Sequence, residues 1–195
     1  MDLGCYPQRV PHPTHRPATY EDLLSVPEHL IAELIDGELY TSPRPAPRHA
    51  LAATTLLSLL HGPFDLGRDG PGGWRILFEP ELHLGDDVVV PDIAAWRHDR
   101  LPRLPDAAYF STAPDWVCEV QSASTAALDR GKKLAVYARE AVGCAWMLDP
   151  LAETLEILRL TAGLWTIVST HVEREVVNAE PFETLGLELT LLWAA

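Results

Sequence analysis

The sequence predicts an α/β fold of the α+β type, with a mixed β-sheet core, flanking helices and additional β-hairpins. Two apolar stretches, over residues 49–61 and 129–142, carry Leu and Ala at helical spacing. Several shorter apolar runs are bounded by Gly, Pro and Asp, as strands usually are. The segments 115–121, 129–142 and 144–148 read as strand, helix and strand, which indicates a βαβ unit with parallel strands and a right-handed crossover. Together these observations predict the element order αβββαβ.

Chain length limits the number of domains. With 195 residues, 47% of them hydrophobic, the chain can bury one sizeable core but not two. Residues 1–18 contain four prolines and show no hydrophobic period, so we expect a poorly ordered arm there. His12 and His15 in this arm are read as incidental rather than as a metal site. We therefore predict a single domain over residues 19–195.

Turn and capping residues delimit the elements of the first half. Thr19 is placed to cap a helix over 20–24, and Asp36-Gly37 supplies the positive φ that a hairpin over 32–40 needs. The next elements are the helix at 49–61 and strands over 74–84 and 87–96, joined by a turn at Gly85-Asp86.

The second half begins with a Pro-containing connection over 101–114, which leads to the strand at 115–121. The helix that follows is expected to end at Gly143, because glycine adopts the left-handed conformation most easily. A hairpin turned at Ala162-Gly163 and short apolar segments at 176–177 and 185–192 complete the chain.

Charge and cysteine content narrow the classes of function. A formal net charge of −13 argues against a broad nucleic-acid-binding surface, because phosphate contacts need clustered Lys and Arg. The basic segments 97–103 and 130–133 are either phosphate contacts or solvated faces. Three cysteines without CxxC spacing argue against structural zinc and a disulfide framework. Apolar runs fall short of the roughly 20 residues that span a bilayer, and no signal pattern is present, so we expect a cytoplasmic protein without membrane association.

Two acidic residues occupy otherwise apolar strands. Asp92 follows three valines and Pro91, and Glu119 lies in the apolar run at 116–120. A buried carboxylate is unfavourable unless a cation, a metal or hydrogen bonds compensate it. If a mixed sheet brings the two together, they provide hard oxygen ligands for Mg²⁺. The simpler interpretation of Asp92 is a turn residue after proline.

The neighbours of Glu119 suggest how such a site is completed. Because side chains alternate along a strand, Glu119 and Gln121 share one face, and we expect Val120 on the other face, packed under the helix that carries Lys133. Lys133 is expected at the surface of that helix, from which its long stem can reach the metal site. The alternative is that Lys132 and Lys133 form the exposed side of an amphipathic helix.

In combination and in order, several segments resemble the Uma-type putative endonucleases of the PD-(D/E)XK restriction-endonuclease-like superfamily. The matching segments are 33–39, 42–43 leading to the helix at His49, 90–94, 114–120, 122–125, 129–137 and 146–150. They extend over about residues 19–192, nearly the whole chain. The order αβββαβ is also the core of that superfamily, so the resemblance implies a restriction-endonuclease-like fold.

The resemblance also implies roles for individual residues. Asp92 and Glu119 match the metal-binding carboxylates, which would hold Mg²⁺ or, in its place, Mn²⁺. The usual lysine of the superfamily stands where this chain has Gln121. Its role is implied to have moved to Lys133, with Gln121 orienting a water. Glu33 matches an additional acidic site residue, and the alternative for it is a solvated hairpin position.

The implied activity is that of a metal-dependent endonuclease that hydrolyses phosphodiester bonds of DNA, as a homodimer because double-strand cleavage needs two sites. The alternative is a non-catalytic binding or scaffold protein that keeps the nuclease fold. The charge of −13 and the presence of Gln121 favour the alternative, whereas the retained acidic residues and lysine favour the enzyme. His49 and His83 are read as capping or partly buried histidines, and the tryptophans as core residues.

Overall fold

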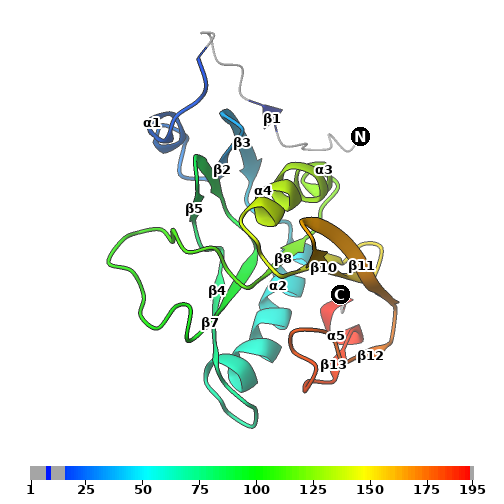
Figure 1. The fold of residues 1–195 in the computed structure, drawn as a ribbon. Coiled ribbons are helices and arrows are strands. Elements are labelled where there is room, and N and C mark those ends of the chain that lie inside the picture. Colours follow the sequence, from blue (N-terminus) through cyan, green and yellow to red (C-terminus); the bar gives the residue numbers. More distant parts are fainter. Residues whose placement is uncertain (1–7, 10–15, 194–195) are drawn as a thin grey trace.

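The structure is a computed structural model and describes residues 8–9 and 16–193 (Figure 1). Its helices are α1 (Tyr20–Leu24), α2 (Pro47–Leu60), α3 (Ala126–Leu128), α4 (Leu134–Arg139) and α5 (Thr190–Trp193), with π-helical turns η1 (His61–Asp65) and η2 (Asp129–Lys133). Its strands are β1 (Gln8–Arg9), β2 (Leu30–Ile35), β3 (Glu38–Pro43), β4 (Trp74–Phe78), β5 (Leu82–Leu84), β6 (Asp87–Val89), β7 (Ile93–Arg97), β8 (Trp116–Val120), β9 (Cys144–Asp149), β10 (Thr154–Thr161), β11 (Leu164–Val172), β12 (Val176–Val177) and β13 (Leu187–Glu188). His12 and His15 lie outside the described residues.

The strands form two larger sheets and one small one. One sheet has six strands in the order β11-β10-β9-β8-β7-β4, another has five in the order β1-β3-β2-β6-β5, and β12 pairs with β13. In the six-stranded sheet β8 and β9 are parallel, whereas the other neighbours are antiparallel. The chain passes from β8 through α3, η2 and α4 to β9, which confirms the predicted βαβ unit.

Local capping and turn signals are confirmed near the N-terminal end of the described chain. Thr19 is the N-cap of α1, and its backbone N–H donates to Oδ2 of Asp22 at 2.8 Å. Asp36 and Gly37 have φ angles of 54° and 71° and turn β2 into β3. A Cβ at Gly37 would lie 2.8 Å from Cβ of Pro17, so both the backbone angle and the close packing require glycine there.

The predicted strands at 74–84 and 87–96 exist, but each is broken in the middle, which corrects the sequence analysis. Their outer parts, β4 and β7, pair in the six-stranded sheet, and their inner parts, β5 and β6, pair in the five-stranded sheet. At the breaks Glu79 has a φ of 43°, and Pro80 and Pro91 have no N–H to donate to a strand ladder. The paired breaks carry this hairpin from one sheet to the other.

The helical segment that follows β8 also differs from the prediction over 129–142. It begins at Ala126, runs through η2 and ends at Arg139. The left-handed residue is Ala141, with a φ of 58°, and not Gly143. The chain turns early because Val142 is fully buried and its N–H donates to the carbonyl of Tyr137 at 2.9 Å.

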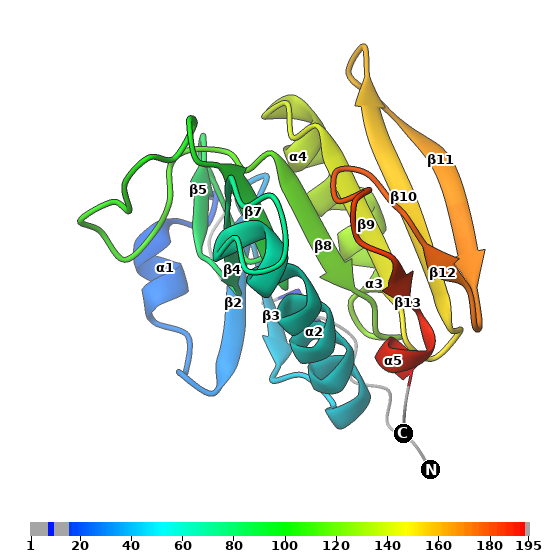
Figure 2. The ribbon, with the colours of Figure 1, turned by 90° about the horizontal axis from the view of Figure 1, so that it is seen from below.

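The two faces of β8 pack against different helices (Figure 2). Trp116, Cys118 and Val120 belong to an apolar cluster that contains the buried residues of α2. Val117, on the opposite face, packs with residues of α4, such as Tyr137. The prediction that Val120 lies under the helix carrying Lys133 is therefore wrong, because that helix covers the face of Val117 and Glu119.

The core contains the aromatic and thiol groups that composition assigned to it. Trp96, Trp116 and Trp146 are among the largest fully buried side chains. Cys118 and Cys144 are buried free thiols, as expected for small hydrophobic residues. Within the described part of the chain, no helix combines the length and the apolar character needed to cross a membrane.

Candidate active site

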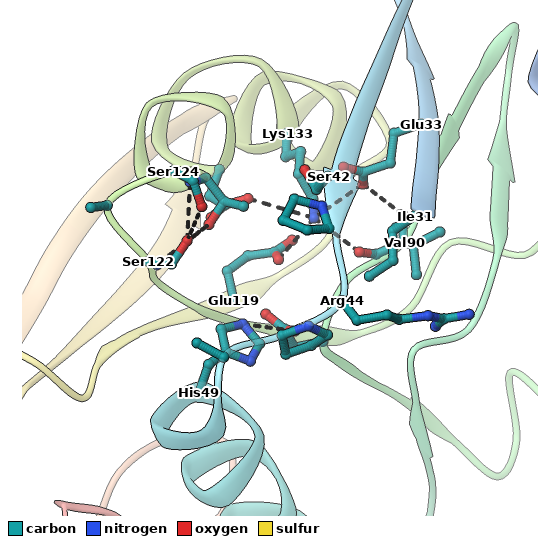
Figure 3. Close-up of a pocket in the computed structure, with 17 residues that line it drawn as sticks. Ile31, Glu33, Ser42, Arg44, His49, Val90, Glu119, Ser122, Ser124 and Lys133 are labelled. Atoms are coloured by element: carbon teal, nitrogen blue, oxygen red, sulfur yellow. Dashed lines mark hydrogen bonds and ion pairs between the residues drawn. The ribbon is translucent and has the colours of Figure 1, made fainter. Parts of the chain in front are cut away.

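Four carboxylates from distant parts of the chain line one cavity of about 350 Å³ (Figure 3). Glu33 comes from β2, Asp92 from the break before β7, Glu119 from β8 and Asp129 from η2. The ammonium of Lys133 lies among them. The structure thus brings together four of the five predicted site residues and adds Asp129.

Lys133 is the centre of a buried ion-pair network. Its Nζ lies 2.9 Å from Oε2 of Glu119, 3.1 Å from Oε1 of Glu33 and 3.6 Å from Oδ1 of Asp129. Nζ also donates to the carbonyl of Val90 at 3.0 Å. The predicted reach to Glu119 is confirmed, but the predicted place at the helix surface is wrong. Lys133 is only 3% exposed, because its partners lie on the sheet side of the helix.

Charge and burial act in opposite directions on Lys133. Burial lowers the pKa of its ammonium, but the negative charges of Glu119 and Glu33 raise the pKa by more. The side chain therefore stays protonated. Its three carboxylate partners cannot all be compensated by this single positive charge.

Glu119 is fully enclosed and has a partner at each oxygen. Oε2 accepts from Lys133, and Oε1 accepts from the hydroxyl of Tyr137 at 2.6 Å. Burial raises the pKa of the Glu119 carboxyl, while Lys133 opposes that rise. Asp129 responds in the same way, since burial raises its pKa to about 6. Both carboxyls hold a proton more tightly than exposed ones do.

Asp92 joins β7 to the end of β8 through its carboxylate. Oδ2 accepts the backbone N–H of Val120 at 2.7 Å, and Oδ1 lies 3.2 Å from Nε2 of His49. Burial lowers the pKa of His49, but the hydrogen bond and charge of Asp92 raise it by more. Asp92 lines the cavity, so the alternative of a simple turn residue does not describe its surroundings.

Glu33 connects β2 to the residue after β6 and to η2 beside the cavity. Its Oε1 accepts the backbone N–H of Val90 at 2.8 Å and lies 3.1 Å from Nζ of Lys133. Glu33 as a whole residue is only 6% exposed, so the alternative of a solvated hairpin position is wrong.

Comparisons with known proteins identify the family and the fold of this chain. A family model described as Uma2, putative restriction endonuclease, matches residues 17–192. The chain belongs to the Uma2 family of putative restriction endonucleases. Among solved structures, a putative nuclease of the family DUF820 from Anabaena variabilis is similar, with a TM-score of 0.75 and 24% sequence identity. The match covers 91% of this chain and 98% of that chain, so the restriction-endonuclease-like fold is confirmed. A comparison with curated proteins gives no match.

Gln121, a predicted site residue, is not brought into the cavity. Its Oε1 accepts from Nε and Nη2 of Arg130 at 3.1 and 2.9 Å. Arg130 is also paired with Glu156. Gln121 is therefore held by the outer side of η2, whereas Lys133 supplies the positive charge at Glu119.

Three further residues of the Uma2 site were not assigned from the sequence. Asp129 and Tyr137 stand four positions before and after Lys133, and this spacing places all three on one helical face, a signal that was available. His49 gave no comparable signal, because its partner Asp92 is distant in the sequence. The opposite wall carries hydroxyl groups, such as Oγ of Ser122, which lies 2.7 Å from Oγ of Ser124.

The donor set of the cavity fits a divalent cation. Within residues 8–9 and 16–193, no three or more His, Cys, Asp or Glu side chains are already grouped as a complete metal site. Asp92 and Glu119 nevertheless face one cavity that holds four carboxylates and one lysine. An excess of hard oxygen donors suits Mg²⁺, which keeps several waters and needs only one or two protein carboxylates.

Proposed function

We propose that this Uma2 chain is a metal-dependent endonuclease that hydrolyses phosphodiester bonds of DNA. The observation that carries the proposal is the meeting of Asp92 and Glu119 at one cavity with the Lys133 ammonium 2.9 Å from Glu119. Family membership supports the nuclease class, and the arrangement of carboxylates and lysine supports the reaction type.

Asp92 and Glu119 would hold Mg²⁺, with Mn²⁺ as a substitute. When bound, such an ion polarises the scissile phosphate and lowers the pKa of a coordinated water. The N–H of Val120 donates to Oδ2 of Asp92, and the hydroxyl of Tyr137 donates to Oε1 of Glu119. These contacts leave lone pairs on the carboxylate oxygens that remain able to bind a cation.

Lys133 would stabilise the negative charge that develops on the phosphate, or position the attacking water. Its permanent charge and its fixed place between Glu33 and Glu119 suit both roles. Glu33 acts through Lys133, because it holds that ammonium and the backbone of Val90. The role of Gln121 in orienting a water stays a prediction, as do the homodimer and the cytoplasmic location.

The electrostatics favour a second candidate, a non-catalytic binding protein of the same fold. The net charge is −13, and cations of both basic segments are paired with carboxylates: Arg100 with Asp115, and Lys132 with Asp36. The cations of these two pairs are therefore not free for phosphate contacts, which argues against the DNA binding that a DNA endonuclease needs.

Nicking of supercoiled plasmid DNA in the presence of Mg²⁺ separates the two candidates. We expect nicking by the wild-type protein, loss with EDTA, and loss in Asp92→Asn and Glu119→Gln. Lys132→Ala is the matched control, because it removes a neighbouring lysine that ion-pairs outside the cavity and should leave nicking within about twofold. Wild-type protein that binds DNA without nicking it would support the non-catalytic candidate.

A further inference from the structure

His49 has a placement that the proposed reaction does not yet use. It is the third residue of α2, and its side chain lines the cavity with 11% exposure. Nε2 lies 3.2 Å from Oδ1 of Asp92, whose side chain is 13% exposed. Figure 3 shows His49 among the residues that line the cavity. Histidine at this point was expected to be only a capping or partly buried residue.

One ring nitrogen of His49 faces Asp92. Nε2 lies within ion-pair distance of Oδ1, so an N–H at this position can donate to that carboxylate oxygen. The other ring nitrogen, Nδ1, is buried and has no hydrogen-bond partner among the described residues. Asp92 is therefore the one polar group in this part of the chain that holds the ring.

Asp92 in turn depends on few contacts for its orientation. It lies in the break between β6 and β7, where the N–H of Glu79 donates to its backbone carbonyl at 3.0 Å and two contacts hold its carboxylate. The N–H of Val120 holds Oδ2, and His49 holds Oδ1. If His49 is removed, the carboxylate can rotate about its remaining hydrogen bond.

We propose that His49 is a positioning residue that holds Asp92 in the orientation needed to bind a divalent cation. A role of His49 in catalysis rests on the proposed function. Its effect on cation affinity can be measured without any assay of activity. Partners that orient metal-binding carboxylates typically change metal affinity by about 10- to 100-fold when they are removed.

Calorimetric titration with Mn²⁺ tests this role in the full chain. We expect His49→Ala to weaken Mn²⁺ binding about 10- to 100-fold, and His49→Gln, whose amide N–H can replace Nε2–H, to recover most of the affinity. His61→Ala is the matched control, because His61 lies at the end of the same helix, pairs with Asp65 and does not line the cavity. It should bind Mn²⁺ as the wild type does.

The outcomes separate this inference from the proposed function. Three results would overturn the role of His49. The first is unchanged Mn²⁺ affinity in His49→Ala, and the second is no Mn²⁺ binding by the wild type. The third is a folded His49→Gln that binds Mn²⁺ as weakly as a folded His49→Ala does. If His49→Ala does not fold, His49→Gln decides alone: near-wild-type affinity supports the role, and a loss of tenfold or more overturns it. Weakened binding in His49→Ala with no plasmid nicking by any protein would refute the endonuclease and leave the positioning role standing.

Discussion

The two faces of β8 show how one short strand serves both stability and chemistry. On one face, Trp116, Cys118 and Val120 are completely buried against the apolar side of α2. On the other face, Glu119 is equally buried but holds an ammonium and a phenol. Burial stabilises the first face by removing apolar surface from water, whereas on the second it imposes a desolvation cost that partners must offset.

The charged face is incompletely compensated, and this is what makes it a candidate site. One ammonium, that of Lys133, lies within ion-pair distance of three carboxylates. Burial, together with the excess negative charge from Glu33 and Asp92, raises the pKa of Asp129 to about 6. A divalent cation would relieve that excess, so stability on this face should depend on metal and pH, whereas stability on the apolar face should not.

Removing Lys133 should produce the largest difference between the faces. In Lys133→Ala, three buried carboxylates lose their counter-charge, so we expect the free energy of unfolding to fall by about 3–5 kcal/mol without metal. Saturating Mn²⁺ should restore part of the loss. Urea unfolding with and without Mn²⁺ measures both effects. Lys132→Ala, with an exposed ion pair, should cost under about 1 kcal/mol. Equal losses from the two lysines would contradict the buried network.

Asp129→Asn should make stability on the charged face less sensitive to pH. The pKa of Asp129 is about 6 in the folded state, whereas the ordinary pKa of an aspartate is 3.8. The stabilisation that comes from its protonation is therefore complete below pH 3.8 and is lost as pH rises through 6. The free energy of unfolding of Asp129→Asn, relative to that of the wild type, should therefore rise between pH 4 and pH 8, by at most about 3 kcal/mol. Urea unfolding across this range in EDTA measures the difference. A difference that is flat, or that grows toward low pH, would contradict the assignment.

Val120→Ala should lower stability on the apolar face of β8 without affecting the charged face. The change removes two buried carbons and leaves a small cavity against α2, so we expect a loss of about 2 kcal/mol. Because the side chain faces away from the carboxylates, this loss should be the same with and without Mn²⁺, and nearly the same at pH 5 and pH 8. A strong metal dependence of the Val120→Ala loss would mean that the two faces are coupled.

Tyr137→Phe should give the smallest effect, and a specific one. It removes only the hydroxyl that donates to Oε1 of Glu119 at 2.6 Å, so stability should fall by about 1.5 kcal/mol. Mn²⁺ affinity should fall about tenfold, because Glu119 loses one of its two anchors. Calorimetry and urea unfolding on the same samples check the two values. A stability loss without any change in Mn²⁺ affinity would limit Tyr137 to the fold.

The elements and most of the site could be predicted because their signals are local. The Asp36-Gly37 turn, the cap at Thr19 and the alternation of Glu119 within an apolar run all depend on a few neighbouring residues. The burial of Lys133 could not be predicted in this way. A lysine beside an apolar stripe normally faces solvent, and only the arrival of Glu33 and Glu119 from other elements makes the interior favourable for it.

The broken strands illustrate the same limit. Val88, Val89 and Val90 before Pro91 read as part of one continuous strand, yet the chain leaves one sheet and enters another there. Which sheet each half joins depends on pairings such as Leu34 with Val88, far apart in the sequence. The position of Asp92 in this break, and its contact with His49, follow from that long-range pairing and carry no local pattern.

We propose that the cavity beside the charged face of β8 holds a divalent cation between Asp92 and Glu119. Crystals grown in EDTA and soaked in Mn²⁺ test it most directly, because anomalous scattering locates manganese without assumptions about activity. We expect a peak in the cavity, about 2.0–2.4 Å from an oxygen of each carboxylate. Well-ordered crystals with Mn²⁺ at other sites and none in this cavity, or with these two carboxylates more than about 8 Å apart, beyond the span of two such bonds, would contradict it.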